Sequence, residues 1–184
     1  FFAFKGNNTD GNLFINDAIK NGSKIIITDK LKRNIWKNNI LFLKDKNPRN
    51  LLAKFSSKIF SKKPKNLIAV TGTNGKSSIA NFYFQILTLN GIKAASIGTL
   101  GVTGLKIKNF FLNTTFDTIK INKILKKLKE KKIENVILEA SSHGLHQNRL
   151  DGLEFDIGIF TNLTRDHLDY HKTFKNYFNS KLIL

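Results

Sequence analysis

The sequence predicts an α/β protein with a small, partial N-terminal α/β domain, followed by a partial ATP-binding domain with a phosphate-binding loop and a mostly parallel sheet. Three observations support this fold class. Apolar runs typical of buried strands alternate with helical patterns along the chain. One such run, residues 67–70, leads through a glycine-containing loop into a helical pattern. In addition, 41% of the 184 residues are hydrophobic, which is enough for a packed core.

In the N-terminal part, short strands and helices alternate before a polar stretch over residues 61–65. The expected strands are residues 1–4, 23–28 and 34–43, and the expected helices are residues 14–21 and 50–60. Pro64 blocks continuation of a helix, which makes the polar stretch the best domain boundary. We therefore expect one domain over residues 1–62 and a second over residues 63–184.

The second domain is expected to alternate strands with crossover helices. The expected strands are residues 67–70, 93–97, 136–139 and 156–160, the expected helices are residues 77–90, 119–132 and 174–184, and residues 102–115 are expected to be irregular or a hairpin. In parallel sheets the functional groups lie beyond the carboxyl ends of the strands. Four such ends carry candidate residues, which are 72–77, 98–100, 139–143 and 161–167.

The loop at residues 71–77, Thr-Gly-Thr-Asn-Gly-Lys-Ser, has the composition of a phosphate-binding loop. Glycines let backbone N–H groups curl around phosphate oxygens, and the next helix directs its positive end at the same anion. Lys76 can reach the β- and γ-phosphates, and the Ser77 hydroxyl can bind Mg²⁺. Val70 stands where the common pattern has its first glycine, so a plain turn with an incidental lysine is the alternative.

The net charge of +18 suggests nucleic-acid binding as another function. However, only four of the 31 basic residues are Arg, the residue favoured for bidentate contacts to bases and phosphates. The densest lysine run, residues 123–132, also has apolar residues at helical spacing. This pattern favours an amphipathic helix with a solvated lysine face over a binding patch.

The chain has no cysteine, which excludes disulfides and thiolate metal sites and fits a reducing compartment. No apolar run reaches membrane-spanning length, and no segment is typical of a signal peptide. The chain also begins within an expected strand and ends within an expected helix. We therefore expect a piece of a longer protein, inactive by itself.

Other candidate functional residues follow the later strands. Glu139 ends an apolar strand, where a carboxylate suits a divalent cation; a capping or ion-paired acid is the alternative. Arg149 suggests recognition of a carboxylate or phosphate. Residues 166–171, Asp-His-Leu-Asp-Tyr-His, lack the glutamate pattern of zinc proteases, which disfavours zinc hydrolysis. The polar triplet at residues 113–115 is by itself more typical of a turn.

Four motifs in this order resemble the Mur ligases, and within them the group called MurE. They are Val-Thr-Gly-Thr-Asn-Gly-Lys-Ser (70–77), Asn-Thr-Thr (113–115), Glu-Ala-Ser-Ser-His-Gly-Leu (139–145) and Thr-Asn-Leu-Thr-Arg-Asp-His-Leu-Asp-Tyr-His (161–171). The opening residues resemble the end of that family's first domain. Phe116 stands where the family usually has proline, and Ser77-Ser78 replaces the commoner Thr-Thr.

This resemblance implies specific roles for residues of the chain. The residues implied to bind ATP are Gly72, Thr73, Asn74, Gly75, Lys76, Ser77 and Ser78. Those implied to hold UDP-MurNAc-dipeptide are Asn7, Asn8, Thr9, Asn113, Thr114, Thr115, Ser141, Gln147 and Arg149. Ser77, Glu139 and His167 would bind Mg²⁺, and Lys181 matches the lysine that this family carries as a carbamate.

The implied activity is an ATP-dependent ligase of peptidoglycan synthesis. It would add meso-diaminopimelate or L-lysine to UDP-MurNAc-L-Ala-D-Glu through an acyl phosphate, as a cytoplasmic monomer. The amino acid would be selected by a third domain, absent from these residues. The alternatives are a folylpolyglutamate-synthase-like ligase, a basic nucleic-acid-binding protein and a non-catalytic remnant that binds only nucleotide.

The dispersed, arginine-poor charge leads to a testable prediction. We expect no submicromolar binding of duplex or single-stranded oligonucleotides at physiological salt, because the lysines do not form a concentrated patch. Fluorescence anisotropy with labelled oligonucleotides checks this. Submicromolar affinity that falls steeply with added salt would contradict it.

Overall fold

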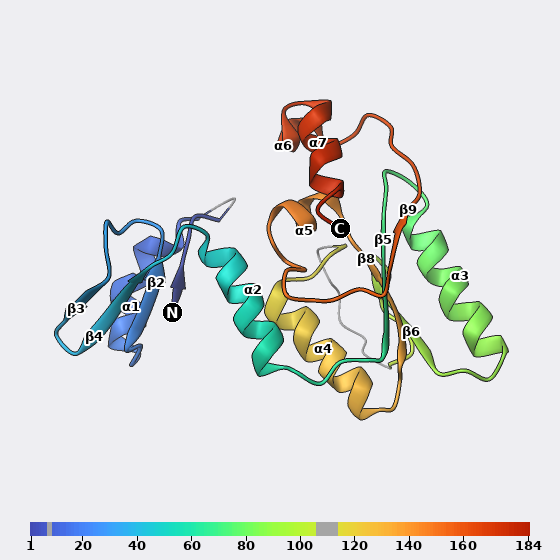
Figure 1. Ribbon diagram of the computed structural model, residues 1–184, viewed down its shortest axis with the longest axis horizontal. Helices are drawn as coiled ribbons and strands as arrows, with labels where there is room; N and C mark the ends of the chain where they lie inside the picture. The colour runs from blue at the N-terminus through green and yellow to red at the C-terminus, as the bar shows by residue number, and fades with distance from the viewer. Residues whose placement is uncertain (7–8, 106–113) are drawn as a thin grey trace. The chain divides into compact units, whose positions relative to one another are not determined.

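The computed structural model describes residues 1–6, 9–105 and 114–184 (Figure 1). The chain forms two compact units, Phe1–Leu52 and Ala53–Leu184. The units divide within helix α2 (Pro48–Ile59), before the polar stretch at residues 61–65.

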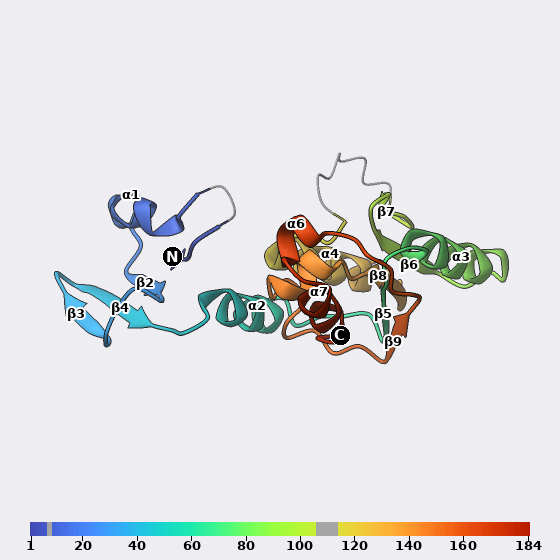
Figure 2. The same ribbon diagram turned by 90° about the horizontal axis from the view of Figure 1, so that it is seen from above.

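The first unit is built on a four-stranded sheet in the order β1-β2-β4-β3. Its strands are β1 (Phe2–Ala3), β2 (Ile25–Thr28), β3 (Ile35–Lys37) and β4 (Ile40–Lys44). Strands β1, β2 and β4 are parallel, and β3 is antiparallel to β4. The 3₁₀ helix η1 (Gly11–Phe14) and helix α1 (Ile15–Lys20) connect β1 to β2, as Figure 2 shows.

The single strand expected over residues 34–43 is wrong, because this segment is the hairpin of β3 and β4. Its turn consists of Asn38 and Asn39, which have φ angles of 51° and 60°. Two-residue hairpin turns often need positive φ at both positions, and Asn tolerates that conformation better than most residues. The Asn-Asn pair between apolar runs was therefore the signal for the turn.

The second unit is built on a five-stranded sheet in the order β7-β6-β8-β5-β9. Its strands are β5 (Asn66–Thr71), β6 (Ala94–Gly98), β7 (Gly101–Val102), β8 (Asn135–Glu139) and β9 (Ile157–Phe160). Four strands are parallel, and only the short β7 runs antiparallel to its neighbour β6. The predicted α/β architecture with parallel sheets is thus confirmed.

Helices cover both faces of this sheet (Figure 1). Helix α4 (Thr118–Glu130) buries Ile121, Leu125 and Leu128 in the larger core cluster. Helix α3 (Lys76–Leu89) packs on the opposite face, where Ala80 joins the smaller cluster. The lysines of α4 lie outside its buried face, so the expected amphipathic helix is confirmed.

Three short helices follow β8, and two of them lie in segments for which no helix was expected. They are α5 (Ser142–His146), α6 (Leu168–His171) and α7 (Phe174–Lys181). The expected C-terminal helix is shorter than predicted, ending at Lys181 rather than at residue 184. Ser141 Oγ accepts a hydrogen bond from Gly144 N at 3.1 Å, which caps α5. This Ser-containing start was therefore a helix signal that the sequence analysis missed.

The helices of the described residues are short. The longest, α3, has 14 residues, whereas a span of the bilayer core needs about 20 apolar residues. Within residues 1–6, 9–105 and 114–184, no helix combines the length and the apolar character needed to cross a membrane.

Candidate functional site

The loop between β5 and α3 is held by the segment that follows β9. Thr73 N donates to the Asn162 carbonyl oxygen at 3.0 Å, and Asn74 N donates to Asn162 Oδ1 at 3.0 Å. Gly72 has a φ of 143°, and a Cβ there would lie 1.9 Å from Thr161 Oγ1. The close approach of the two segments therefore requires glycine at this position.

Lys76 begins α3 and folds its side chain back over the loop. Its Nζ donates to the carbonyl oxygens of Gly72 at 2.9 Å and Thr73 at 2.7 Å. Burial lowers the pKa of Lys76, while the charges of Glu139 and Asp166 oppose that shift. The ammonium thus lies at the N-terminal end of a 14-residue helix, where the backbone also favours an anion.

The carboxylate of Glu139 is 3% exposed and accepts three hydrogen bonds. Ser77 Oγ donates to Oε2 at 2.8 Å, Thr99 N donates to Oε1 at 3.1 Å, and Thr99 Oγ1 donates to Oε2 at 3.1 Å. A Cβ at Gly98 would lie 2.0 Å from Glu139 Oε1, so only glycine leaves room for the carboxylate. The predicted strand-end residues 98–100 included Thr99, but its role was not foreseen.

The backbone of Glu139 is also tied to the segment around Thr115. Thr115 Oγ1 donates to the Glu139 carbonyl oxygen at 2.9 Å and accepts from Ser141 N at 2.9 Å. Arg149 Nη1 donates to the Thr115 carbonyl oxygen, and Arg149 Nη2 donates to Gln147 Oε1 at 2.7 Å. The structure therefore brings together four of the predicted substrate-binding residues at the carboxyl end of β8.

Phe116 anchors this segment where the sequence resemblance led us to expect proline. Its side chain is 3% exposed and belongs to the larger core cluster, which also includes Leu145 of α5. Core packing of an aromatic ring can fix a loop without the fixed φ angle of proline. Position 116 is therefore held by core packing, although the chain lacks the proline that the family usually has there.

Lys181 lies inside the second unit, and its side chain is not a surface group. It is 2% exposed, and its Nζ donates to the Gly72 carbonyl oxygen at 2.6 Å. The pKa of Lys181 is lowered to about 8, chiefly by burial and also by the nearby charge of Lys76, while Asp166 opposes the shift. Two lysine side chains, Lys76 and Lys181, therefore share one carbonyl oxygen.

All four histidines of the chain gather around α5 and α6. The ring centroid of His143 lies 4.8 Å from that of His167 and 5.4 Å from that of His171, and His146 lies 5.7 Å from His171. His171 is 4% exposed; burial, followed by the charges of the other histidines, lowers its pKa to about 4. His171 is therefore neutral at physiological pH.

Within the part of the chain that the structure describes, no three His, Cys, Asp or Glu side chains are placed to hold a metal ion. His167 is exposed and lies 3.5 Å from the Asp166 carboxylate, whereas Glu139 is bonded to Ser77 and Thr99.

Some predicted site residues cannot be placed beside these groups. Asn7, Asn8 and Asn113 lie outside the described residues. Thr9 is exposed and belongs to the first unit, while Ser78 is exposed on α3. Thr114 contacts the site through Thr99, whose Oγ1 lies 3.1 Å from Thr114 Oγ1.

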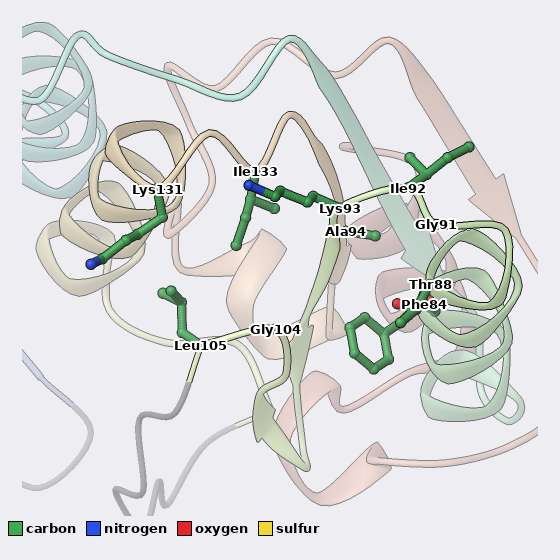
Figure 3. A pocket seen from close by; sticks show the side chains of 10 residues that line it. All are labelled: Phe84, Thr88, Gly91, Ile92, Lys93, Ala94, Gly104, Leu105, Lys131 and Ile133. Atoms are coloured by element: carbon green, nitrogen blue, oxygen red, sulfur yellow. Dashed lines mark hydrogen bonds between the residues drawn. The ribbon is translucent and has the colours of Figure 1, made fainter.

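A cavity of about 460 Å³ lies elsewhere in the second unit (Figure 3). Its lining includes Phe84, Thr88, Ile92, Lys93, Leu105 and Ile133. Lys93 directly precedes β6, and Ile133 lies just before the amino end of β8. Because these strands are parallel to β5, the cavity lies at the opposite edge of the sheet from the β5–α3 loop.

Comparisons with known proteins agree with the sequence motifs. The family model described as "Mur ligase middle domain" matches residues 70–184. The UDP-N-acetylmuramoyl-L-alanyl-D-glutamate–2,6-diaminopimelate ligase of Rickettsia montanensis is 47% identical over 188 residues and covers the whole chain. The enzyme of that name from Clostridium tetani is 43% identical over 189 residues. The chain spans 39% of the length of each of these relatives.

Solved structures show the same relationship. A structure of a UDP-N-acetylmuramoyl-L-alanyl-D-glutamate–2,6-diaminopimelate ligase aligns with a TM-score of 0.79 and 29% identity, covering 100% of this chain and 37% of that one. The MurF ligase of Thermotoga maritima, solved with ADP, aligns over the whole chain and 39% of its own, with a TM-score of 0.60 and 19% identity. E. coli FolC with ADP has a TM-score of 0.55 and 18% identity, over 72% of this chain and 38% of its own. The last two similarities support the fold alone.

The crowding of Glu139 against Gly98 leads to a prediction. Gly98→Ala should lower the free energy of unfolding by about 1–3 kcal/mol, because the new Cβ displaces a buried carboxylate from its donors. Chemical denaturation measures this change. Gly158→Ala in β9 is the matched control, since its nearest contact would be an ordinary 3.7 Å to Leu184. Equal stabilities of the two variants would contradict the prediction.

Proposed function

Because the chain belongs to the Mur ligase family, we propose that it is part of an ATP-dependent ligase of the MurE type. The whole enzyme would add an amino acid to UDP-MurNAc-L-Ala-D-Glu in peptidoglycan synthesis. The relatives at 47% and 43% identity are 2,6-diaminopimelate ligases by name, which favours this amino acid over L-lysine. The observation that carries the proposal is the contact between Ser77, in the first turn of α3, and the buried Glu139.

The β5–α3 loop would bind the phosphates of ATP through residues Gly72 to Ser78. Lys76 Nζ now donates to two loop carbonyls, and phosphate oxygens could replace these as stronger acceptors. The backbone N–H groups at the start of α3 would add further donors. Residues 63–184 would form the ATP-binding domain, and residues 1–62 would contribute to binding the UDP substrate.

The residues present fit a bound Mg²⁺, which prefers oxygen ligands. The Ser77 hydroxyl and the Glu139 carboxylate already contact each other, so one cation could bind both oxygens. His167 and a modified Lys181 would be the remaining protein ligands. When bound, Mg²⁺ would offset the negative charge of the phosphates, as cations do in phosphoryl transfer.

The UDP-MurNAc-dipeptide would lie against the segment from Asn113 to Thr115 and the residues after β8. Ser141 and Arg149 are already hydrogen-bonded to Thr115, and Arg149 is also hydrogen-bonded to Gln147. Such preformed contacts reduce the ordering cost of binding. Asn7, Asn8 and Thr9 would contribute from the first domain.

In the proposed reaction the γ-phosphoryl group passes to the glutamyl carboxylate and gives an acyl phosphate. The amine of the incoming amino acid then displaces phosphate and forms the amide. Lys76 would stabilise the charge on the transferring group, so the protein contributes mainly positioning and electrostatics. The third domain typical of this family would deliver the amino acid.

Lys181 would act as a carbamate in this site. Its lowered pKa of about 8 provides neutral amine, which can attack CO₂ and release a proton to give a carbamate anion. The change from +1 to −1 would also replace the repulsion between Lys181 and Lys76 by attraction. The anion could then join Glu139 and His167 around Mg²⁺.

The rival functions have less support. A folylpolyglutamate-synthase-like ligase would share the fold, but FolC is 18% identical, against 47% for a diaminopimelate ligase that matches the whole chain. Nucleic-acid binding would rest on the lysines of α4, which form the solvated side of an amphipathic helix. A cytoplasmic location and a monomeric state remain predictions.

The proposed role of Lys76 predicts a severe catalytic defect. In the full-length enzyme, Lys76→Ala should lower the rate of ligation on the order of a thousandfold, because several kcal/mol of charge stabilisation are lost. Phosphate release in the presence of all three substrates measures this. Lys127→Ala, an exposed change on α4, is the control and should keep normal turnover. Near-normal turnover of Lys76→Ala would rule out a catalytic loop.

The carbamate proposal predicts chemical rescue. Lys181→Ala in the full-length enzyme should lose activity and regain part of it with added short carboxylates, which can replace the missing anion. Lys175→Ala is the matched control, because Lys175 is exposed on the same helix. Full activity of Lys181→Ala without any additive would show that no carbamate is needed.

A further inference from the structure

Thr99 occupies a position between two groups that the proposed function assigns to different ligands. It follows the last residue of β6, and its hydroxyl lies 3.1 Å from Glu139 Oε2 and 3.1 Å from Thr114 Oγ1. Glu139 would bind Mg²⁺ with the nucleotide, and Thr114 would contact the UDP substrate. Neither the motifs nor the relatives' names assign a role to Thr99.

Glu139 Oε2 and Thr114 Oγ1 compete for the hydroxyl proton of Thr99. A threonine hydroxyl has one hydrogen to donate, so Thr99 Oγ1 donates fully either to the carboxylate or to Thr114 Oγ1. An anionic acceptor makes the stronger hydrogen bond, which favours Glu139 when no cation is bound. A cation on Glu139 would weaken that bond and release the proton towards Thr114. Thr114 would then be a better donor to substrate, because hydrogen bonds in a chain polarise one another.

Contacts around Thr99 show that the hydroxyl, rather than the backbone, makes this connection. Thr99 N donates separately to Glu139 Oε1 at 3.1 Å, a bond that any residue except proline could make. The neighbouring Thr115 contacts the carbonyl oxygen of Glu139 and not its carboxylate. Of these contacts, only the Thr99 hydroxyl connects the segment of Thr114 to the Glu139 side chain.

We propose that Thr99 is a positioning residue that couples metal–nucleotide binding at Glu139 to substrate binding at Thr114. The inference rests on the proposed function, because that function assigns the two ligands. Thermodynamic linkage requires the coupling to be reciprocal, so each ligand should tighten binding of the other.

The test compares binding constants in the full-length protein by isothermal titration calorimetry. The Mg²⁺ complex of the β,γ-imido analogue of ATP is titrated into the protein. This is done first without and then with saturating UDP-MurNAc-L-Ala-D-Glu. The analogue prevents phosphoryl transfer, so the readout is affinity and not activity. Wild type is compared with Thr99→Val, which removes the hydroxyl at nearly constant shape, and with Thr99→Ser, which keeps it.

Thr103→Val is the matched control for loss of a threonine hydroxyl. Thr103 Oγ1 accepts from Ser96 N at 2.9 Å and contacts Ser96 Oγ at 2.7 Å, so this change affects the strand pair but not Glu139. Thr99 is exposed, and thermal unfolding should show that Thr99→Val is folded. If it is not folded, Thr114→Val removes the other end of the same connection.

In wild type, Thr99→Ser and Thr103→Val, we expect the substrate to tighten nucleotide binding by roughly fivefold or more. In Thr99→Val the ratio of nucleotide affinities with and without substrate should fall to within about twofold of one. Chelation of Mg²⁺ should make this ratio the same in all the proteins. The inference would be overturned if the substrate tightened nucleotide binding as strongly in Thr99→Val as in wild type. It would also be overturned if wild type bound both ligands but the substrate did not change its nucleotide affinity. Failure of wild type to bind either ligand would instead refute the proposed function.

Discussion

The buried carboxylate of Glu139 is the constraint on which the rest of the site depends. A charge that is 3% exposed is costly unless donors compensate for lost hydration, and here Ser77 and Thr99 provide them. These donors come from the first turn of α3 and from the residue that follows β6, so satisfying one carboxylate fixes two segments. Thr115 adds a third segment through the Glu139 backbone. Glycine is needed at position 98 for the same reason, because a Cβ there would occupy the space of the Glu139 carboxylate.

The positive charges near this carboxylate support the proposed binding of phosphates. Lys76 and Lys181 both donate to the Gly72 carbonyl oxygen, and burial lowers the pKa of each. Two close ammonium groups repel each other, so the site gains stability when an anion lies between them or when one lysine loses its charge. A bound polyphosphate would provide the first solution and a carbamate would provide the second. Both would fit the proposed ATP-dependent ligase.

Much of the second unit could be predicted from local patterns, because its buried parallel strands are continuous apolar runs and its helices have amphipathic spacing. The β5–α3 loop was recognisable from residues 71–77 alone. The role of Thr99 was not, since it arises from a contact with Glu139, which is distant in the sequence. The burial of Lys181 likewise depends on how α7 packs in the fold. The turn at Asn38 and Asn39 and the cap at Ser141 had local signals that were not used.

The most direct test of the central claim is the Mg²⁺ dependence of ATP binding to the full-length protein and to Glu139→Gln. The amide keeps the size of the side chain but removes the charge that would hold the cation. The account predicts that Mg²⁺ strengthens ATP binding to wild type by about tenfold or more, equivalent to about 1.4 kcal/mol, and that Glu139→Gln loses this effect. An equal response of both proteins to Mg²⁺ would contradict the account.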